Sequence, residues 1–233
     1  MKGVLFELKG NWGHFRKPET NNNPLTHDFI TKTALIGLIG AVLGIEREEM
    51  KELFPQLSED LLYGVCVKKA VKKESWAFTL RYVVDLLQKA PKQMEFLKNP
   101  ENTIALALKN ENSSAIFDDF VFAIQNDEAQ FTPVLGLHNC PAEIELISVG
   151  AFQIKAGNFS TKGFVKENQF DAGKTLASNK LRVGLEKIPT FQNNDFWNLP
   201  EKYEKVIYPS ENQEVFANGE FYEFTDGSQW TLI

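Results

Sequence analysis

The residues best suited to chemistry lie in one polar stretch near the start of the chain, GNWGHFRKPETNNNP at 10–24. Arg16 and Lys17 stand there between the aromatic Phe15 and the rigid Pro18. Cations beside a planar ring suit the binding of phosphate groups and the stacking of other planar rings. The stretch is unexpected because the 233-residue chain has a formal net charge of −6.

The net charge averages over segments of opposite sign. Three basic and three acidic segments alternate, with net charges of +2 (1–45), −4 (46–63), +5 (64–98), −7 (99–149), +4 (150–190) and −6 (191–233). This interleaving is expected if the basic segments converge on one face and the acidic ones lie elsewhere. A chance alternation of solvated surfaces would give the same counts.

Composition predicts a globular, cytoplasmic protein. With 43% hydrophobic residues the chain can bury a core, and it has neither a twenty-residue apolar run nor a basic and apolar leader. Cys66 and Cys140 lie in apolar surroundings without a CxxC or a His/Cys cluster, which favours buried thiols over a disulfide or a metal site. We expect no metal, no cofactor and no membrane partner.

The first part of the chain predicts a strand, a long loop and a helix. KGVLFELK at 2–9 alternates as a strand does, and the polar run 10–31 predicts a loop. Thr31 is a suitable N-cap for a helix over 32–45, whose apolar residues repeat at helical spacing. Gly40 inside this helix indicates a close approach, most simply to the sheet.

The remaining periodicities predict further strands and helices. A second, acidic helix is expected at 46–53 and another at 114–126, with strands at 62–71, 75–84, 103–109 and 143–155. Strands 62–71 and 75–84 are expected to pair as a basic hairpin. The order strand, helix, strands, helix, strand is the β-α-β-β-α-β order of a ferredoxin-like fold, with the basic hairpin inserted between the helices.

We therefore predict an α+β fold. A ferredoxin-like (RRM-like) domain is expected over 1–155, with the basic hairpin inserted at 62–84. Residues 156–233 are expected to form a long loop (156–180) and a smaller β-rich part.

Three blocks carry a family resemblance: FELKGNWGHFRKP with LTHDFITKTALIGLIGAVLG, PKQMEFLKNPENTIALAL at 91–108, and FTPVLGLHNCPAEIE at 131–145. Together and in this order they resemble the Cas-five family of CRISPR-associated proteins, over most of residues 4–145. The resemblance to that family is weaker over residues 150–233.

The resemblance implies a repeat-associated RNA-binding (RAMP) fold and a role in a type I CRISPR surveillance complex of the Cascade kind. In such complexes the family member holds the 5′ handle of the CRISPR RNA, caps one end of the repeated backbone subunits and contacts the large subunit. The loop style and the missing leader look most like the subtype I-B branch. The implied role is non-catalytic and belongs to antiviral defence.

The residues expected to bind RNA follow from this role. Arg16 and Lys17 are the strongest candidates for phosphate contacts. Trp12 and Phe15 are candidates for stacking on a base, although a tryptophan beside the first strand is as often a lid on the core. The start of the first helix, at Lys32 and Thr33, presents free N–H groups that suit a phosphate, although Thr33 is as well explained by capping.

The basic hairpin adds further candidates. Lys68, Lys69 and Arg81 belong to its most basic part. Adjacent residues of a strand face opposite sides, so only one of Lys68 and Lys69 is expected to meet a single RNA path.

An enzyme remains the first alternative, because one branch of the family cuts precursor CRISPR RNA. Cleavage without a metal needs a base and an acid within hydrogen-bond reach of the RNA. His14, His27, Tyr63 and Lys69 are the candidate catalytic residues, but they form no compact cluster in the sequence. A histidine in an RNA-contacting loop is more often a partner of a base or phosphate.

A structural module without direct RNA contact is the second alternative. The acidic tail carries aromatic residues at near-alternating positions: Phe216, Phe221, Tyr222, Phe224 and Trp230. Such spacing is typical of a strand in the core, and it would also suit an exposed surface that docks a neighbouring subunit.

Overall fold

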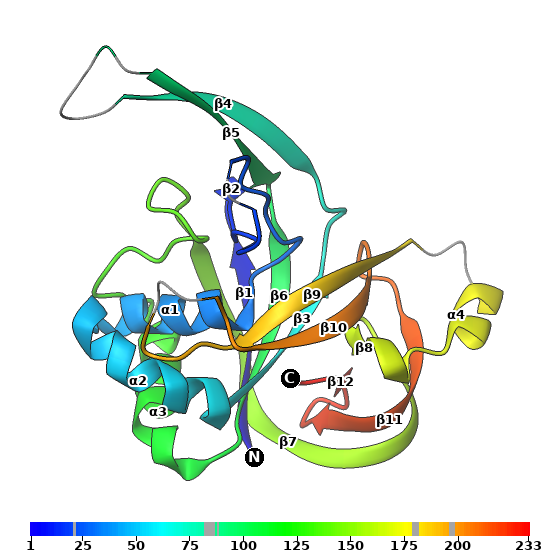
Figure 1. The fold of residues 1–233 in the computed structure, drawn as a ribbon. Coiled ribbons are helices and arrows are strands. Elements are labelled where there is room, and N and C mark those ends of the chain that lie inside the picture. Colours follow the sequence, from blue (N-terminus) through cyan, green and yellow to red (C-terminus); the bar gives the residue numbers. More distant parts are fainter. Residues whose placement is uncertain (21, 82–86, 88, 179–181, 196–198) are drawn as a thin grey trace.

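The structure is a computed structural model, and it describes the chain except residues 21, 82–86, 88, 179–181 and 196–198 (Figure 1). The helices in the described part are α1 (Lys32–Leu43), α2 (Arg47–Asp60), α3 (Ser114–Gln125) and α4 (Ala172–Ser178), with short 3-10 turns at Glu111–Ser113 and Glu167–Gln169. The strands are β1 (Lys2–Lys9), β2 (Trp12–Gly13), β3 (Leu61–Val67), β4 (Lys73–Arg81), β5 (Lys89–Lys98), β6 (Glu101–Leu108), β7 (Glu143–Thr161), β8 (Val165–Lys166), β9 (Val183–Phe191), β10 (Lys202–Pro209), β11 (Val215–Phe224) and β12 (Gln229–Trp230).

The main sheet has the strand order β12-β11-β7-β1-β6-β3. Its strands β7, β1, β6 and β3 pair antiparallel throughout. Numbered along the chain, these four strands have the order fourth, first, third, second, and helices connect the first to the second and the third to the fourth. This is the ferredoxin-like arrangement, so the predicted α+β fold is confirmed.

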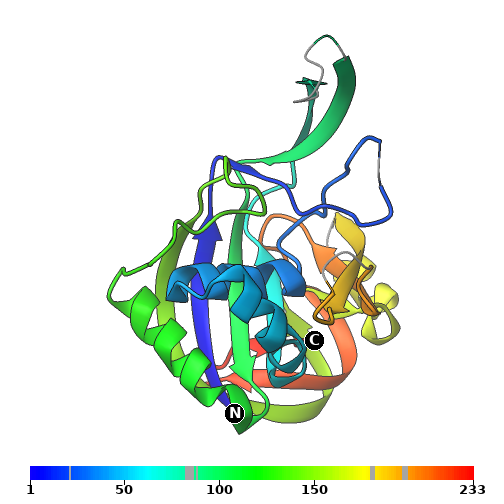
Figure 2. The ribbon, with the colours of Figure 1, turned by 60° about the vertical axis from the view of Figure 1, so that its left-hand side comes forward.

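The two faces of the sheet are covered by different elements. Val4, Phe6 and Leu8 of β1 point to the helical side, where Phe6 packs edge-on against Phe120 of α3 at 5.7 Å. Figure 2 shows α1 in blue and α3 in green lying across this side. Leu5 points the other way, into a smaller cluster that includes Trp230 of β12. The alternation read from the sequence therefore places β1 between two apolar layers.

The aromatic residues of the C-terminal strands pack in this smaller cluster and in a neighbouring one that contains Phe221. Phe221, Tyr222, Phe224 and Trp230 are all less than a tenth exposed, and Phe224 packs on Phe152 with ring centroids 4.8 Å apart. These residues are strand core. The alternative of an exposed aromatic docking surface is wrong for these four.

Helix α1 begins as expected and ends at a glycine. The Thr31 hydroxyl accepts a hydrogen bond from the Ala34 N–H at 3.2 Å, and Gly44 closes the helix with a φ of 71°. A Cβ on Gly40 would lie 2.6 Å from Sδ of Met50, which belongs to α2. The close approach indicated by Gly40 is therefore to the second helix and not to the sheet.

The prediction of a hairpin at 62–84 is wrong. Strand β3 pairs with β6 inside the main sheet, and β4 pairs instead with β5, so the hairpin spans Lys73–Lys98. The reason is burial: Tyr63, Val65, Cys66 and Val67 are all less than a tenth exposed, as in a strand covered on both faces. Figure 1 shows the β4–β5 hairpin projecting from the body of the molecule.

Two further boundaries differ from the expectation. Helix α2 continues to Asp60 because Phe54 and Leu57 extend its buried face. The expected loop over 156–180 contains the end of β7, β8 and α4. Strand β7 pairs with β1 through Ala151 and with β11 from Phe152 to Thr161, so the expected division after residue 155 falls inside one strand.

Strands β8, β10 and β9 form a small separate sheet beside the helices. Cys66 and Cys140 are buried free thiols, as expected. Within the described residues, no helix is long and apolar enough to cross a membrane.

Candidate functional site

The basic loop is fixed at its start by backbone contacts with two other segments. Strand β2 pairs with the end of β5, at Lys98 and Leu97. The His14 N–H donates to the Leu135 carbonyl at 2.9 Å. Gly136 has a φ of 89° and packs against the His14 carbonyl: a Cβ on Gly136 would lie 2.0 Å from the His14 carbonyl oxygen. Only glycine fits this contact.

The rest of the loop folds back on itself. The Lys17 N–H donates to the Leu25 carbonyl and the His27 N–H to the Phe15 carbonyl, both at 2.8 Å. An isolated bridge joins Arg16 to Thr26. Side chains therefore alternate along this segment: Phe15 is buried, and Arg16 is exposed, with its Nη2 donating to the Thr20 carbonyl at 3.2 Å.

A buried carboxylate anchors the loop to β9. Glu186 is 3% exposed and accepts hydrogen bonds from Lys17 Nζ at 3.0 Å, His27 Nδ1 at 2.9 Å and the Asp28 N–H at 3.2 Å. Burial by itself raises the pKa of Glu186, but the bonds from His27 and Lys17 outweigh it and lower that pKa to about 2. The main role of Lys17 is therefore to form an internal ion pair with Glu186.

A second ion pair ties the loop to the hairpin. Lys73 of β4 binds Asp28 at 2.7 Å and Glu95 of β5 at 3.2 Å. Burial lowers the pKa of Lys73, but the two carboxylates outweigh it and the net shift is upward. Asp28 also accepts a hydrogen bond from the Tyr208 hydroxyl of β10. Loop, hairpin and small sheet are thus held as one unit.

A pocket of about 410 Å³ opens beside this unit. Arg16 lines it together with Thr31 and Thr33 at the start of α1. Its other lining residues are aromatic, apolar or small, apart from His14, and they include four prolines: Pro18, Pro24, Pro189 and Pro200. Among the described residues that line it there is no carboxylate, so Arg16 and the positive end of the α1 dipole set its electrostatic character.

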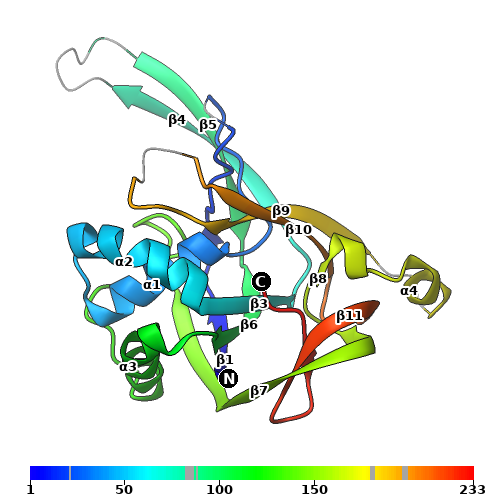
Figure 3. The ribbon, with the colours of Figure 1, turned by 60° about the horizontal axis from the view of Figure 1, so that its bottom comes forward.

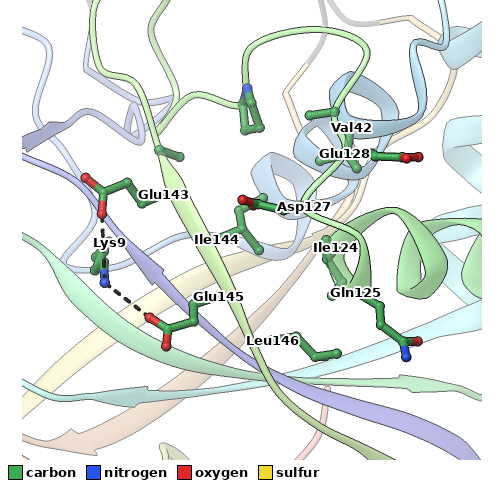
Figure 4. Close-up of a pocket in the computed structure, with 13 residues that line it drawn as sticks. Lys9, Val42, Ile124, Gln125, Asp127, Glu128, Glu143, Ile144, Glu145 and Leu146 are labelled. Carbon is green, nitrogen blue, oxygen red and sulfur yellow. Dashed lines mark hydrogen bonds and ion pairs between the residues drawn. The ribbon is translucent and has the colours of Figure 1, made fainter.

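Another pocket, of about 640 Å³, has the opposite character (Figure 4). Val42, Ile124, Ile144 and Leu146 give it apolar side chains, and four carboxylates line it: Asp127, Glu128, Glu143 and Glu145. Lys9 is bound by Glu145 at 3.3 Å and Glu143 at 3.8 Å. A phosphate backbone would be repelled here.

The aromatic residues near the loop form a cluster at the base of the hairpin. Trp12 is half-buried and packs on Trp76 of β4, with ring centroids 4.5 Å apart. Trp76 in turn contacts Phe96 of β5 at 4.7 Å and Phe78 at 6.3 Å. Sequence analysis missed Trp76 and Phe78 as site residues, although their spacing of two in a strand was a signal that they share a face.

The predicted RNA-binding residues are only partly brought together. Arg16, Phe15, His14 and Thr33 line one pocket, but Phe15 is 3% exposed and packs in the core. Lys32 points into a different cavity. Lys68 and Lys69 follow the end of β3, so the prediction that the strand continues through them is wrong. That only one of the two lysines meets RNA stays a prediction. The side chain of Arg81 lies outside the described residues.

The candidate catalytic residues each have separate partners. Tyr63 is fully buried, its hydroxyl lies 3.5 Å from the Ile30 carbonyl, and burial raises its pKa. His14 Nδ1 lies 2.7 Å from the Glu95 carbonyl, and burial lowers the pKa of its ring. His27 binds Glu186, and the exposed Lys69 pairs with Glu101.

Solved structures with the same fold include two with CRISPR in their names and one type III-B Cmr-beta complex. A CRISPR protein from Archaeoglobus fulgidus aligns with a TM-score of 0.58 and 17% identity, over 99% of this chain and 98% of that chain. A chain of a CRISPR RNA-guided surveillance complex aligns with a TM-score of 0.57 and 11% identity, over 93% and 91%. A chain of a type III-B Cmr-beta complex bound to cognate target RNA and AMPPnP gives 0.51 and 8%, over 92% and 86%. At these identities the likeness concerns the fold alone.

Comparison by sequence is more specific. No curated protein matches this chain. Residues 3–196 match the model of the family described as CRISPR-associated protein (Cas_Cas5). Because this match includes the basic loop, the hairpin and most of the main sheet, the chain belongs to the CRISPR-associated Cas_Cas5 family.

Proposed function

We propose that this chain is a non-catalytic RNA-binding subunit of a type I CRISPR surveillance complex, of the Cascade kind, and serves antiviral defence. In this proposal it grips the 5′ handle of the CRISPR RNA in the pocket beside Arg16 and caps the backbone subunits. Subtype I-B is the branch that its basic loop favours. The observation that carries the proposal is that Arg16 and the first turn of α1 line one pocket without a carboxylate among its described lining residues.

The pocket offers two kinds of contact to a single strand. The Arg16 guanidinium and the Thr33 N–H suit a phosphate, because the Thr31 cap reaches only the Ala34 N–H and the Lys32 N–H is bound to the Tyr63 hydroxyl. The proline walls of the pocket suit the faces of unpaired bases, and so do the half-buried rings of Trp76 and Phe78, which lie outside the pocket at the hairpin base. Together these groups recognise unpaired RNA better than a stacked duplex.

Binding of labelled repeat-derived handle RNA to the purified chain tests the proposal. Arg16→Ala is expected to weaken binding about tenfold to a hundredfold, since a charge-assisted contact is lost. The slope of log affinity against log salt is expected to fall by about 0.7. Arg47→Ala is the matched control, because Arg47 is an exposed arginine at the start of α2. Equal affinity and slope in the Arg16 variant would refute the proposal.

The same assay, run in chelator with single-turnover sampling, separates the alternatives. Specific cleavage at one phosphodiester, lost on replacing His14 or His27, would favour an endoribonuclease that processes precursor CRISPR RNA. We favour the binder because Tyr63 is fully buried and because His27 is tied to Glu186. No RNA binding at all, together with intact assembly, would favour a structural module.

Protein partners belong to the proposal as well. We propose the backbone subunits and the large subunit of the complex as neighbours of this chain. The acidic pocket of Figure 4 suits a protein segment that carries lysine or arginine and an apolar side chain, because its carboxylates surround apolar side chains.

A further inference from the structure

A second basic cavity lies apart from the RNA pocket, with no lining residue in common. Its volume is about 480 Å³. It is enclosed by the ends of elements that are distant in sequence: the start of α1, the end of α2, and strands β9 to β11. Figure 3 shows α2, β3 and the C-terminal end of the chain gathered near β10.

Lys32 is the unusual residue of this cavity. It is 5% exposed, and within the described part of the chain its Nζ has no hydrogen-bond or ion-pair partner. A buried ammonium group without a partner is costly, so such lysines are rare unless something pairs with them. Burial lowers the pKa of Lys32 to about 8, and it is the largest of the causes.

The charges that act on Lys32 do not cancel. Glu59 favours its ammonium form, whereas Lys109 and Lys202 oppose it. Glu59 is itself bound to Lys202. Four lysines (Lys32, Lys109, Lys166 and Lys202) and three carboxylates (Glu59, Glu204 and Glu220) line the cavity, so the cations exceed the carboxylates by one, which suits a bound anion. Glu220, which also lines the cavity, lies 3.3 Å from the Tyr222 hydroxyl, a separate interaction.

Two other features of the cavity suit a ligand. Ser58 lines it, is 4% exposed, and has an Oγ without a hydrogen-bond partner among the described residues. Phe191 and Tyr222 add aromatic surface, and Lys202 Nζ lies 4.5 Å from the Phe191 ring centre. Lysines bind phosphate as point charges, and a planar base would find an apolar wall opposite them.

We propose that this cavity is a phosphate site, in which Lys32, Lys109 and Lys202 bind the phosphate of a nucleotide and Ser58 donates a hydrogen bond to it. A cavity of this size suits a small ligand. The nucleotide is either free or the terminal residue of an RNA. The site is independent of the pocket beside Arg16.

Calorimetric titration of the full chain with adenosine monophosphate, inorganic phosphate, and a short RNA with and without a 5′-phosphate tests the site. Lys32→Met is expected to weaken phosphate-dependent binding about tenfold to a hundredfold. Its fold is expected to persist, since methionine fills the space of the lysine stem without a buried charge. Lys51→Met is the control, because Lys51 pairs with Glu48 on the surface of α2.

The outcomes separate the two sources of the phosphate. Binding of adenosine monophosphate that depends on Lys32 indicates a free nucleotide, and binding only of the 5′-phosphorylated RNA indicates an RNA end. Arg16→Ala is expected to leave binding of adenosine monophosphate unchanged, so a failure of the RNA pocket would not remove this site. Should the Lys32 variant not fold, Lys109→Ala gives the same test with an exposed residue. The proposal is overturned if no probe binds, or if binding is equal in the lysine variants and the control.

Discussion

The strongest stability prediction concerns Glu186, which connects β9 to the basic loop. Replacing it by glutamine removes the charge that Lys17 and His27 share but keeps a side chain of the same size. Removing one partner of a buried ion pair costs about 3–5 kcal/mol, because the other charge is left unpaired. Because the Lys17 side chain is 26% exposed, its ammonium group can rotate into solvent. We therefore expect the free energy of unfolding to fall by about 3 kcal/mol.

For a chain of this length, a loss of 1 kcal/mol lowers the melting temperature by about 2–4 °C. Glu186→Gln is therefore expected to melt about 6–12 °C below the parent protein at neutral pH. Thermal unfolding followed by circular dichroism measures this shift. Glu143→Gln is the matched control, since its side chain is 75% exposed and lies 3.8 Å from Lys9. Exposed pairs of that kind contribute about 0–1 kcal/mol.

The pH dependence gives the same prediction an independent readout. A carboxyl whose pKa is lowered in the folded state stabilises the protein above its unfolded pKa. That stabilisation is lost as the pH falls through the folded value. For Glu186 the window runs from its ordinary value of 4.5 down to about 2. The parent protein should lose stability more steeply than the glutamine variant in this window. Equal melting temperatures for Glu186→Gln and Glu143→Gln, or parallel acid profiles, would refute the role of Glu186.

Two further predictions concern the other contacts of the site. Gly136→Ala is expected to lower the melting temperature by about 4–8 °C and to weaken handle RNA binding, because a Cβ would meet the His14 carbonyl. The control is Gly37→Ala, which has open space around it and should be neutral or stabilising. The prediction fails if both variants melt alike. Glu145→Lys is expected to reduce co-purification of partner subunits several-fold without weakening RNA binding by the isolated chain. The control is Glu111→Lys, at an exposed position. Equal recovery of partner subunits with both variants would argue against docking at the acidic pocket.

The parts of the fold that follow local rules were predictable from the sequence. The Thr31 cap and the 3.6-residue spacing locate α1, and the apolar face of 114–126 locates α3. These signals arise within a few residues of one another. The β-α-β-β-α-β order then follows from the sequence of elements, because few topologies satisfy it.

Strand partners were not predictable in the same way. The alternation of β4 fits any antiparallel neighbour, and the short turn at 72–74 favoured β3 over the distant β5. What decides the pairing is burial: β3 is covered on both faces, so it belongs to the main sheet, where it forms the edge beside β6. Strand β7 was predicted too short, because its residues from Gln153 to Asn158 are exposed and give no apolar alternation.

The candidate site depends on contacts between residues far apart in the chain, and a sequence gives no measure of these. Lys17 and Glu186 are separated by 169 positions, and Lys73 and Asp28 come from different elements. Counting cations in the basic segments therefore overstates the charge available to RNA. Lys17 pairs with the buried Glu186 and Lys73 with the half-buried Asp28 and Glu95, whereas Arg16 lines the pocket. A salt slope reduced by about 0.7 for Arg16→Ala, beside a nearly unchanged slope for Lys17→Ala, is the result that this division of roles requires. An acidic protein can thus keep a basic loop because part of the loop's charge holds its own fold.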